Sequence, residues 1–177
     1  MQGVRRVVTG VNEAGASIVV EDGIPPNVVA PGGGTGYAWT DVWITDSVSS
    51  PAEGGDHAPN SMSLEPPRGG ITWKVIVLPP ESALKDMDWP AFQAEMRERA
   101  PLMSGTGQHD RNRPGFHRTD TIDFVVIVSG ELVLELEDGE VRVGPGDCVV
   151  QRGTWHAWHN RGSVPCVMSA VLLSTPE

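Results

Sequence analysis

Two histidines and one aspartate in the C-terminal half of the sequence are residue types that bind metal ions. His117 and Asp123 lie in one segment, and His156 lies in a second segment that begins at Gly153. Two imidazoles and one carboxylate can hold a divalent ion and leave open positions for a substrate or O₂. Because the composition of such a facial triad suits Fe(II), we expect Fe(II) first, and Zn, Mn or Ni are also compatible.

The spacing of His117 and Asp123 sets a condition on this site. Alternate residues of a strand share one face, so a strand here would project the following side chains together: His117, Thr119, Thr121 and Asp123. Residues six apart on a straight strand lie about 20 Å apart. The two groups can therefore bind one ion only if the strand bends, or if a turn falls between them.

The surrounding sequence predicts a dense succession of β-strands. Alternating segments are expected at 117–128, 131–137, 140–143, 148–151, 155–158 and 164–173. They are separated by turn sequences such as Ser129-Gly130 and Asp138-Gly139. The 21 glycines and 15 prolines, about a fifth of the 177 residues, also favour a turn-rich β protein. This regular alternation of short strands and turns predicts a barrel or sandwich.

The N-terminal part is expected to contribute strands at 4–10, 16–21, 37–45 and 71–78, all in the same sheet system. One helix is predicted near 89–100, with Asp88 as its cap and an apolar stripe that docks on the barrel. The segments 46–70 and 104–115 are predicted loops, which carry His57 and His109 and whose role the sequence leaves open. We expect one domain over 1–177, with 1–115 packing on a core at 116–177.

Seven landmarks from Phe116 to Asn160 resemble the two motifs of the cupin superfamily. His117, Asp123 and Gly130 follow the order of the first motif. The second motif is matched by Pro145-Gly146-Asp147, Gly153, His156 and Asn160. The sequence departs from the family pattern at Thr119, which stands at the position of the second motif histidine. It departs again at Asp123, which replaces the commoner glutamate.

The resemblance implies an all-β, cupin-type double-stranded β-helix (a jelly-roll barrel) with N-terminal strands and one short peripheral helix. It also implies a mononuclear metalloenzyme acting on a small oxygenated organic molecule, as a dioxygenase, decarboxylase, lyase or dehydratase, or isomerase. The expected ligands of one ion per chain are His117, Asp123 and His156. A non-catalytic module that binds a metabolite or metal, and a metal-free structural cupin, are the alternatives.

Other residues are candidates for contact with the substrate. Thr119, Thr121 and His109 could orient it, and three tryptophans could line an aromatic pocket or belong to the core: Trp43, Trp73 and Trp158. A carboxylate such as Asp123 inside a barrel is costly without a partner, so we expect a cation or an arginine beside it.

The overall charge narrows the range of partners. A net charge of −10 repels phosphate backbones and anionic lipids, so neither nucleic acid nor membrane is an expected partner. No apolar run approaches the ~18 residues of a spanning helix, and the predicted location is the cytoplasm. Both cysteines, Cys148 and Cys166, are expected to be buried free thiols.

One strand face predicts an oligomer. Four apolar side chains project from the side opposite Asp123: Ile122, Phe124, Val126 and Val128. Such a face has to be covered, either by other parts of the chain or by a second copy. We expect a homodimer with the N-terminal strands lying across the interface.

Overall fold

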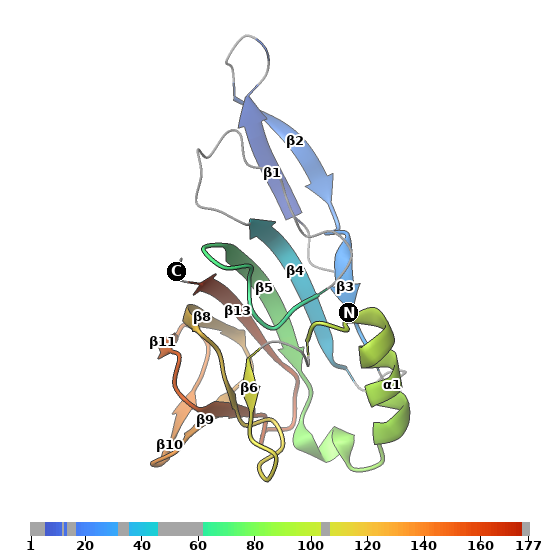
Figure 1. The fold of residues 1–177 in the computed structure, drawn as a ribbon, viewed down its shortest axis with the longest axis vertical. Helices are drawn as coiled ribbons and strands as arrows, with labels where there is room; N and C mark the ends of the chain where they lie inside the picture. Colours follow the sequence, from blue (N-terminus) through green and yellow to red (C-terminus); the bar gives the residue numbers. More distant parts are fainter. Residues whose placement is uncertain are drawn as a thin grey trace.

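The computed structural model describes residues 6–11, 13, 17–31, 36–45, 62–103 and 107–174. Within them, the chain forms two antiparallel sheets, a separate two-stranded ribbon and one α-helix (Figure 1). The predicted all-β class with one short helix is confirmed.

Six strands form the larger sheet, in the order β11-β8-β13-β5-β4-β3. Their bounds are β3 Asn27–Val29, β4 Ala38–Thr45, β5 Ile71–Leu78, β8 Thr121–Ser129, β11 Cys148–Arg152 and β13 Cys166–Ser174. Five shorter strands form the second sheet, in the order β10-β9-β12-β7-β6. Their bounds are β6 Gln108–His109, β7 His117–Arg118, β9 Leu132–Leu136, β10 Glu140–Val143 and β12 His156–His159.

The strand that carries the metal motif is broken, as the spacing of its residues requires. After Arg118 the chain leaves the five-stranded sheet, and at Thr121 it enters the six-stranded sheet as β8. The segment predicted as one strand is therefore two strands, with Thr119 and Asp120 at the corner between the sheets.

The alternation along β8 separates an inner from an outer face. Thr121, Asp123, Val125 and Ile127 are buried, and the residues between them are exposed, which confirms the predicted facing. The inward residues change from polar to apolar along the strand. Val125 and Ile127 belong to a core cluster shared with β9, β10 and β13, so an apolar core fills one end of the barrel. The hydroxyls and the carboxylate lie at the other end.

The ribbon consists of β1 (Arg6–Val11) and β2 (Ser17–Gly23), which pair only with each other. The expectation that all N-terminal strands join the barrel sheets is therefore wrong for these two, whereas β3, β4 and β5 do join the larger sheet. Figure 1 shows the ribbon projecting beyond the end of β4, away from the rest of the fold.

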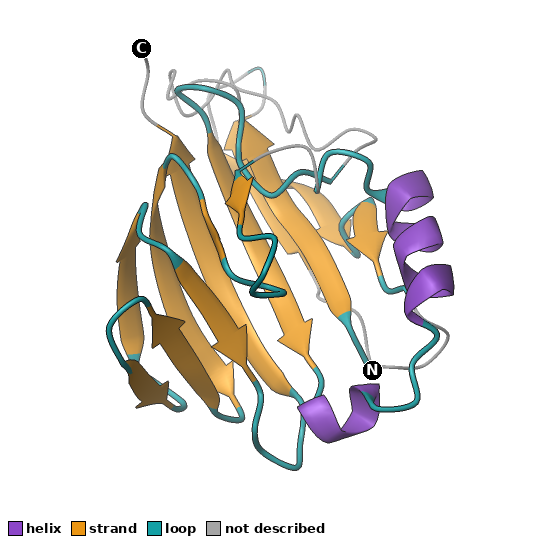
Figure 2. Cartoon of the chain, turned by 60° about the horizontal axis from the view of Figure 1, so that its bottom comes forward, coloured by secondary structure: helices purple, strands orange, loops and turns teal. Residues whose placement is uncertain are grey.

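The helical segments are η1 (Glu81–Leu84) and α1 (Trp89–Arg99), which lie at one edge of the sheets (Figure 2). Asp88 caps α1, since its side chain accepts a hydrogen bond from the Ala91 amide at 3.0 Å. Met96 packs on a small cluster that includes Val29 of β3. Of the described helices, none has the length and apolarity needed to cross a bilayer.

Candidate metal centre

Three histidines lie in a row across three neighbouring strands. The strand register pairs His109 of β6 with His117 of β7, and His117 with His156 of β12. Directly paired residues of antiparallel strands project to the same side of a sheet. The ring centroids of His117 and His156 are 4.4 Å apart, and those of His109 and His117 are 5.9 Å apart.

Backbone carbonyls fix the imidazole rings of His117 and His156 in the same way. The Nδ1 atom of His117 lies 2.9 Å from the Gly115 carbonyl oxygen, and that of His156 lies 3.0 Å from the Thr154 carbonyl oxygen. A carbonyl only accepts, so each Nδ1 carries the proton and each Nε2 keeps its lone pair. Neither Nε2 has a hydrogen-bond partner among the described residues. Since no enclosed side-chain nitrogen or oxygen there lacks a partner, both are open to solvent or a ligand.

Burial holds both imidazoles in the neutral form. It lowers the pKa of His117, a shift that nearby His109 reinforces and the bond to Gly115 opposes. Burial, followed by the proximity of His117, lowers the pKa of His156 to about 4. A neutral imidazole with Nδ1–H donated to a carbonyl and a free Nε2 is the form of histidine that binds metals.

Asp123 ends a short chain of hydrogen bonds. The hydroxyls of Thr119 and Thr121 are 2.7 Å apart, and the Thr121 hydroxyl donates to Asp123 Oδ1 at 2.6 Å. The pKa of Asp123 is raised to about 6, chiefly by burial; the Thr121 bond opposes the shift and the charge of Glu65 adds to it. The expected arginine is not beside it, because no positive charge contributes to this shift.

The structure assembles only part of the predicted three-residue site. Within the part of the chain that it describes, no three His, Cys, Asp or Glu side chains come close enough to hold an ion. His117 and His156 are adjacent, and Asp123 is buried on β8 of the facing sheet. Its inclusion as a third ligand stays a prediction.

The C-terminal part of the chain matches a known protein family. The family model for the cupin domain matches residues 107–173, which include all three histidines of the row and Asp123. Residues 107–173 are therefore a cupin domain. The matched segment runs from β6 to β13, so β1 to β5 and α1 lie outside it.

Curated relatives share short segments with this chain. Oryzines biosynthesis cluster protein J of Aspergillus oryzae is 53% identical over 53 residues, which are 29% of this chain and 30% of that protein. A cupin-domain-containing oxidoreductase of Hypocrea virens is 41% identical over 61 residues, which are 32% of this chain and 31% of the relative. The matched segments thus span about a third of the length of these relatives.

A solved structure with a double-stranded β-helix domain, an uncharacterized conserved protein from Klebsiella pneumoniae, is also similar. It is 15% identical, with a TM-score of 0.44 over 82% of each chain.

The structure separates the three candidate tryptophans. Trp158 lies beside His156, with ring centroids 6.1 Å apart, and also packs against the apolar core. Trp73 pairs with Trp43 across β5 and β4, and its indole donates to Ser169 on the outward side of β13 at 2.7 Å. Trp43 and Trp73 are therefore not brought to the histidines. His57, another candidate, falls outside the described residues.

The inner wall contains polar residues that the sequence reasoning missed. Lys74 of β5 donates to Asp41 of β4 at 2.5 Å, and both side chains are almost fully buried. Gln151 of β11 is buried and pairs in register with Asp123. The sequence could have indicated the Lys74–Asp41 pair, because the alternation of the strand places Lys74 on its inward face. His109 was a candidate from the sequence, but its place beside His117 was not predictable, since β6 has only two residues.

Two further predictions concern residues outside the row. Asp147 stabilises its turn as expected, because Oδ2 accepts a bond from the Gly144 amide at 2.8 Å. The prediction of two buried thiols is wrong for Cys148, which is exposed at the edge strand β11, and correct for Cys166.

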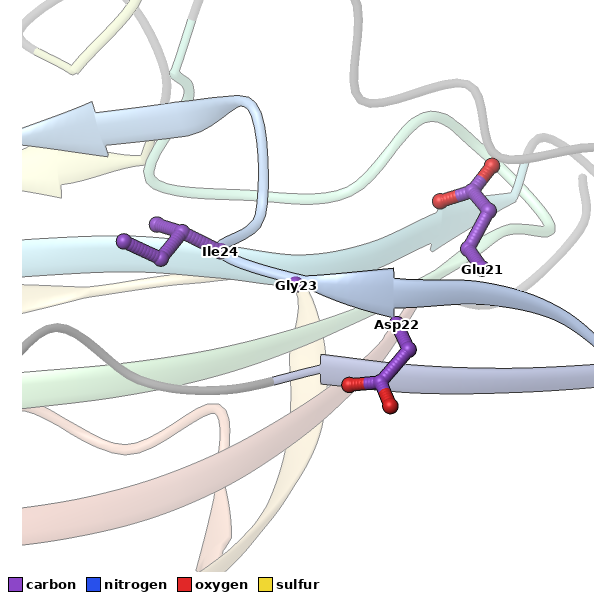
Figure 3. A pocket seen from close by; sticks show the side chains of 4 residues that line it. All are labelled: Glu21, Asp22, Gly23 and Ile24. Carbon is purple, nitrogen blue, oxygen red and sulfur yellow. The ribbon is translucent and has the colours of Figure 1, made fainter.

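An open hollow of about 270 Å³ lies on β2, lined by Glu21, Asp22, Gly23 and Ile24 (Figure 3). None of the candidate metal ligands lines this hollow.

Proposed function

We propose that this cupin is a metal-dependent enzyme that acts on a small oxygenated organic molecule. In this proposal, a divalent ion is held by His117 and His156 through Nε2, and Asp123 is the anionic third ligand. The observation that carries it is the pair of adjacent neutral imidazoles, each fixed through Nδ1 to a backbone carbonyl.

The donor set fits a divalent ion of the first transition row. Two neutral nitrogens and one carboxylate suit Fe(II) best, with Zn, Mn or Ni as further options. Asp123 Oδ2 has no hydrogen-bond partner among the described residues, so it keeps an acceptor for a cation. Burial disfavours the ionised carboxylate, and a nearby cation would offset that cost. When bound, the ion polarises a carbonyl or carboxylate group of the substrate.

The residues around the two rings have distinct tasks. The carbonyls of Gly115 and Thr154 fix the orientation and tautomer of the imidazoles. Thr121 holds Asp123 in place, and Thr119 extends this hydrogen-bonded chain toward the corner between the sheets. Trp158 supplies an apolar wall next to His156.

The third histidine of the row orients the substrate in this proposal. His109 is exposed and stacks near His117, beyond the pair that holds the ion. Its ring can donate to or accept from a polar group of a bound molecule.

The names of the relatives favour the oxidative branch of cupin chemistry. Three are called cupin-domain-containing oxidoreductases, and others are named for biosynthesis clusters. We therefore place dioxygenation or another oxidation of a small metabolite ahead of decarboxylation, lyase or isomerase chemistry.

An oxygen-uptake assay tests the proposal. The protein is loaded with Fe(II) under argon, desalted, and mixed with a small-molecule extract of the cells that express it. We expect O₂ uptake and consumption of at least one metabolite. Both should be lost in His156→Ala and kept in His159→Ala, a control on the same strand. Metal that binds without any turnover would favour the non-catalytic module, and absence of bound metal would favour the structural one.

A further inference from the structure

The same arrangement of three residues leads into each of the two adjacent histidines. In residues 115–117 (Gly-Phe-His) and 154–156 (Thr-Trp-His), the first residue supplies the carbonyl bonded to Nδ1, the second is aromatic and the third is the histidine. Each histidine is also the first residue of its strand, β7 or β12. The orientation of both rings therefore depends on the peptide groups just before the strands.

The pairing of the two strands does not by itself fix the rings. β7 has only two residues, and its ladder with β12 consists of one residue pair, His117 with His156. So small a contact does not hold two strands at a fixed angle. A further contact has to set the 4.4 Å separation of the two ring centroids.

The aromatic residues of the two triplets stack on each other. The rings of Phe116 and Trp155 have centroids 5.7 Å apart, and their planes lie within 7° of parallel. The guanidinium carbon of Arg113 lies 3.5 Å from the centroid of the Phe116 ring, and that of Arg118 lies 5.5 Å from the centroid of the Trp155 ring. Both kinds of contact are attractive. We call these four side chains the aromatic clamp.

The aromatic clamp lies on the outer side of the five-stranded sheet. Arg118 follows His117 in β7, and consecutive residues of a strand point to opposite faces. Since Arg118 lies over Trp155, the clamp lies on the side away from the histidine rings. It can position the two rings, but it does not contact an ion or a substrate that they bind.

Arg113 ties one end of the aromatic clamp to a neighbouring strand. Its guanidinium forms an ion pair with Glu135 of β9. The Phe116 amide donates to the Arg113 carbonyl at 3.0 Å. Because a peptide group is planar, this bond also sets the direction of the Gly115 carbonyl, which accepts from His117.

Gln151 supports the carbonyl at the other end. Its Nε2 atom donates to the Thr154 carbonyl at 3.0 Å, and the same oxygen accepts the bond from His156 Nδ1. A carbonyl oxygen has two lone pairs and can accept both bonds. The aromatic stack then holds this peptide group at a fixed distance from its counterpart in 115–117.

We propose that the aromatic clamp is the positioning device of the two histidines, and that the stack of Phe116 on Trp155 keeps both imidazoles in the Nδ1–H tautomer with Nε2 free. Without the stack, the two peptide groups can turn, and each ring can place its proton on Nε2 instead. A protonated Nε2 has no lone pair for a metal. The consequence for metal binding rests on the proposed function, whereas the tautomer is a property of the metal-free protein.

Nitrogen-15 NMR of the histidine rings tests the aromatic clamp without metal. At neutral pH, with a chelator present, His117 and His156 of the unmodified protein should both show the Nδ1–H tautomer. In Trp155→Leu their signals should move toward the Nε2–H tautomer, while His159, which is held by two carboxylates, should keep its signals. Trp155→Phe retains a flat ring that can stack and should resemble the unmodified protein.

The affinity for Zn²⁺, measured by competition with a chelator, is the second readout. Trp155→Leu should bind Zn²⁺ about 10- to 100-fold more weakly, the usual effect of losing a group that orients a metal ligand, and Trp155→Phe should come within about twofold of the unmodified protein. Trp89→Leu is the matched control, because Trp89 is exposed on α1 and also packs against a phenylalanine, Phe92. It should change neither readout.

Three results would overturn the proposal. They are an Nε2–H tautomer at either ring of the unmodified protein, a folded Trp155→Leu protein in which both rings keep the Nδ1–H tautomer, and equal effects of Trp155→Leu and Trp155→Phe. If the unmodified protein binds no zinc, the proposed metal centre fails, and the tautomer measurement still decides on the clamp. If Trp155→Leu does not fold, Arg113→Lys takes its place: it keeps a charge for Glu135, removes the flat guanidinium from Phe116 and should shift the tautomer of His117.

Discussion

Acidification should change the stability of the metal-free protein in opposite directions through two buried groups, Asp123 and His156. Burial raises the pKa of Asp123 from 3.8 to about 6 and lowers that of His156 from 6.5 to about 4. Between pH 6.5 and 4 the unfolded chain binds the histidine proton more strongly than the folded one does, so His156 makes stability fall on acidification. Between pH 6 and 3.8 the folded chain binds the aspartate proton more strongly, so Asp123 makes stability rise.

The two contributions nearly cancel in the unmodified protein, and single substitutions separate them. A pKa that differs by one between the folded and unfolded chains corresponds to about 1.4 kcal/mol, so each group contributes about 2 to 3 kcal/mol across its window. Relative to the unmodified protein, Asp123→Asn should be more stable at pH 7 and lose about 2 to 3 kcal/mol of that advantage by pH 4. His156→Gln should gain about the same amount, relative to the unmodified protein, on going from pH 7 to pH 4.

Urea unfolding in the presence of a chelator, at half-unit steps from pH 4 to 7.5, measures these differences. Subtracting the curve of the unmodified protein removes the titration of the many surface carboxylates. Asp120→Asn, at an exposed neighbour, is the matched control for the loss of one carboxylate. A flat difference for His156→Gln, or slopes of the same sign for both variants, would refute the assignment of a neutral buried imidazole at His156 and an uncompensated buried carboxyl at Asp123.

Three further substitutions test the fold around the site. Gly130→Ala should cost about 2 kcal/mol or more of the free energy of unfolding. At its φ of +76° a Cβ would lie 2.7 Å from the backbone of Pro165 and Cys166, whereas Gly139→Ala (φ +94°) meets no atom within 4 Å and should cost less. Asp41→Ala should lower the free energy of unfolding by about 3 to 5 kcal/mol, because it leaves the buried Lys74 ammonium without its carboxylate; replacing both partners with apolar residues should recover most of it. Thr121→Val should raise the pKa of Asp123 further, as a carbon-13 NMR titration would show, because the hydroxyl now stabilises the ionised carboxylate. An unchanged pKa would mean that this bond does not form.

The strands were predictable wherever turns and alternation coincide. Ile71–Leu78 and Glu140–Val143 begin and end where the sequence predicts, and the inward set of β8 follows from a period of two. The break at Thr119 and Asp120 was predictable only as a condition for metal binding, since no glycine or proline marks it. The separation of the β1–β2 ribbon was not predictable, because strand patterns do not say which strands pair.

The candidate site was predictable only in part, because strand pairing also decides which of its residues meet. Motif spacing identified His117 and His156, which the structure places side by side. The position of His109 in the row depends on the pairing of a two-residue strand, and the outward position of Trp73 depends on the register of β5 with β13. Neither of these long-range pairings is encoded in the local pattern of residues.

Metal content tests the central claim most directly. The protein is loaded with Fe(II) under argon and desalted, and the bound metal is measured by mass spectrometry per chain. The proposed centre predicts about one ion per chain, near-complete loss in His117→Ala and His156→Ala, and weaker retention in Asp123→Asn, because the carboxylate is its only anionic ligand. His159→Ala should keep the ion, since that ring is engaged by Glu81 and Glu135. Bound metal that is unchanged in both His117→Ala and His156→Ala, or absent from the unmodified protein, would contradict the account.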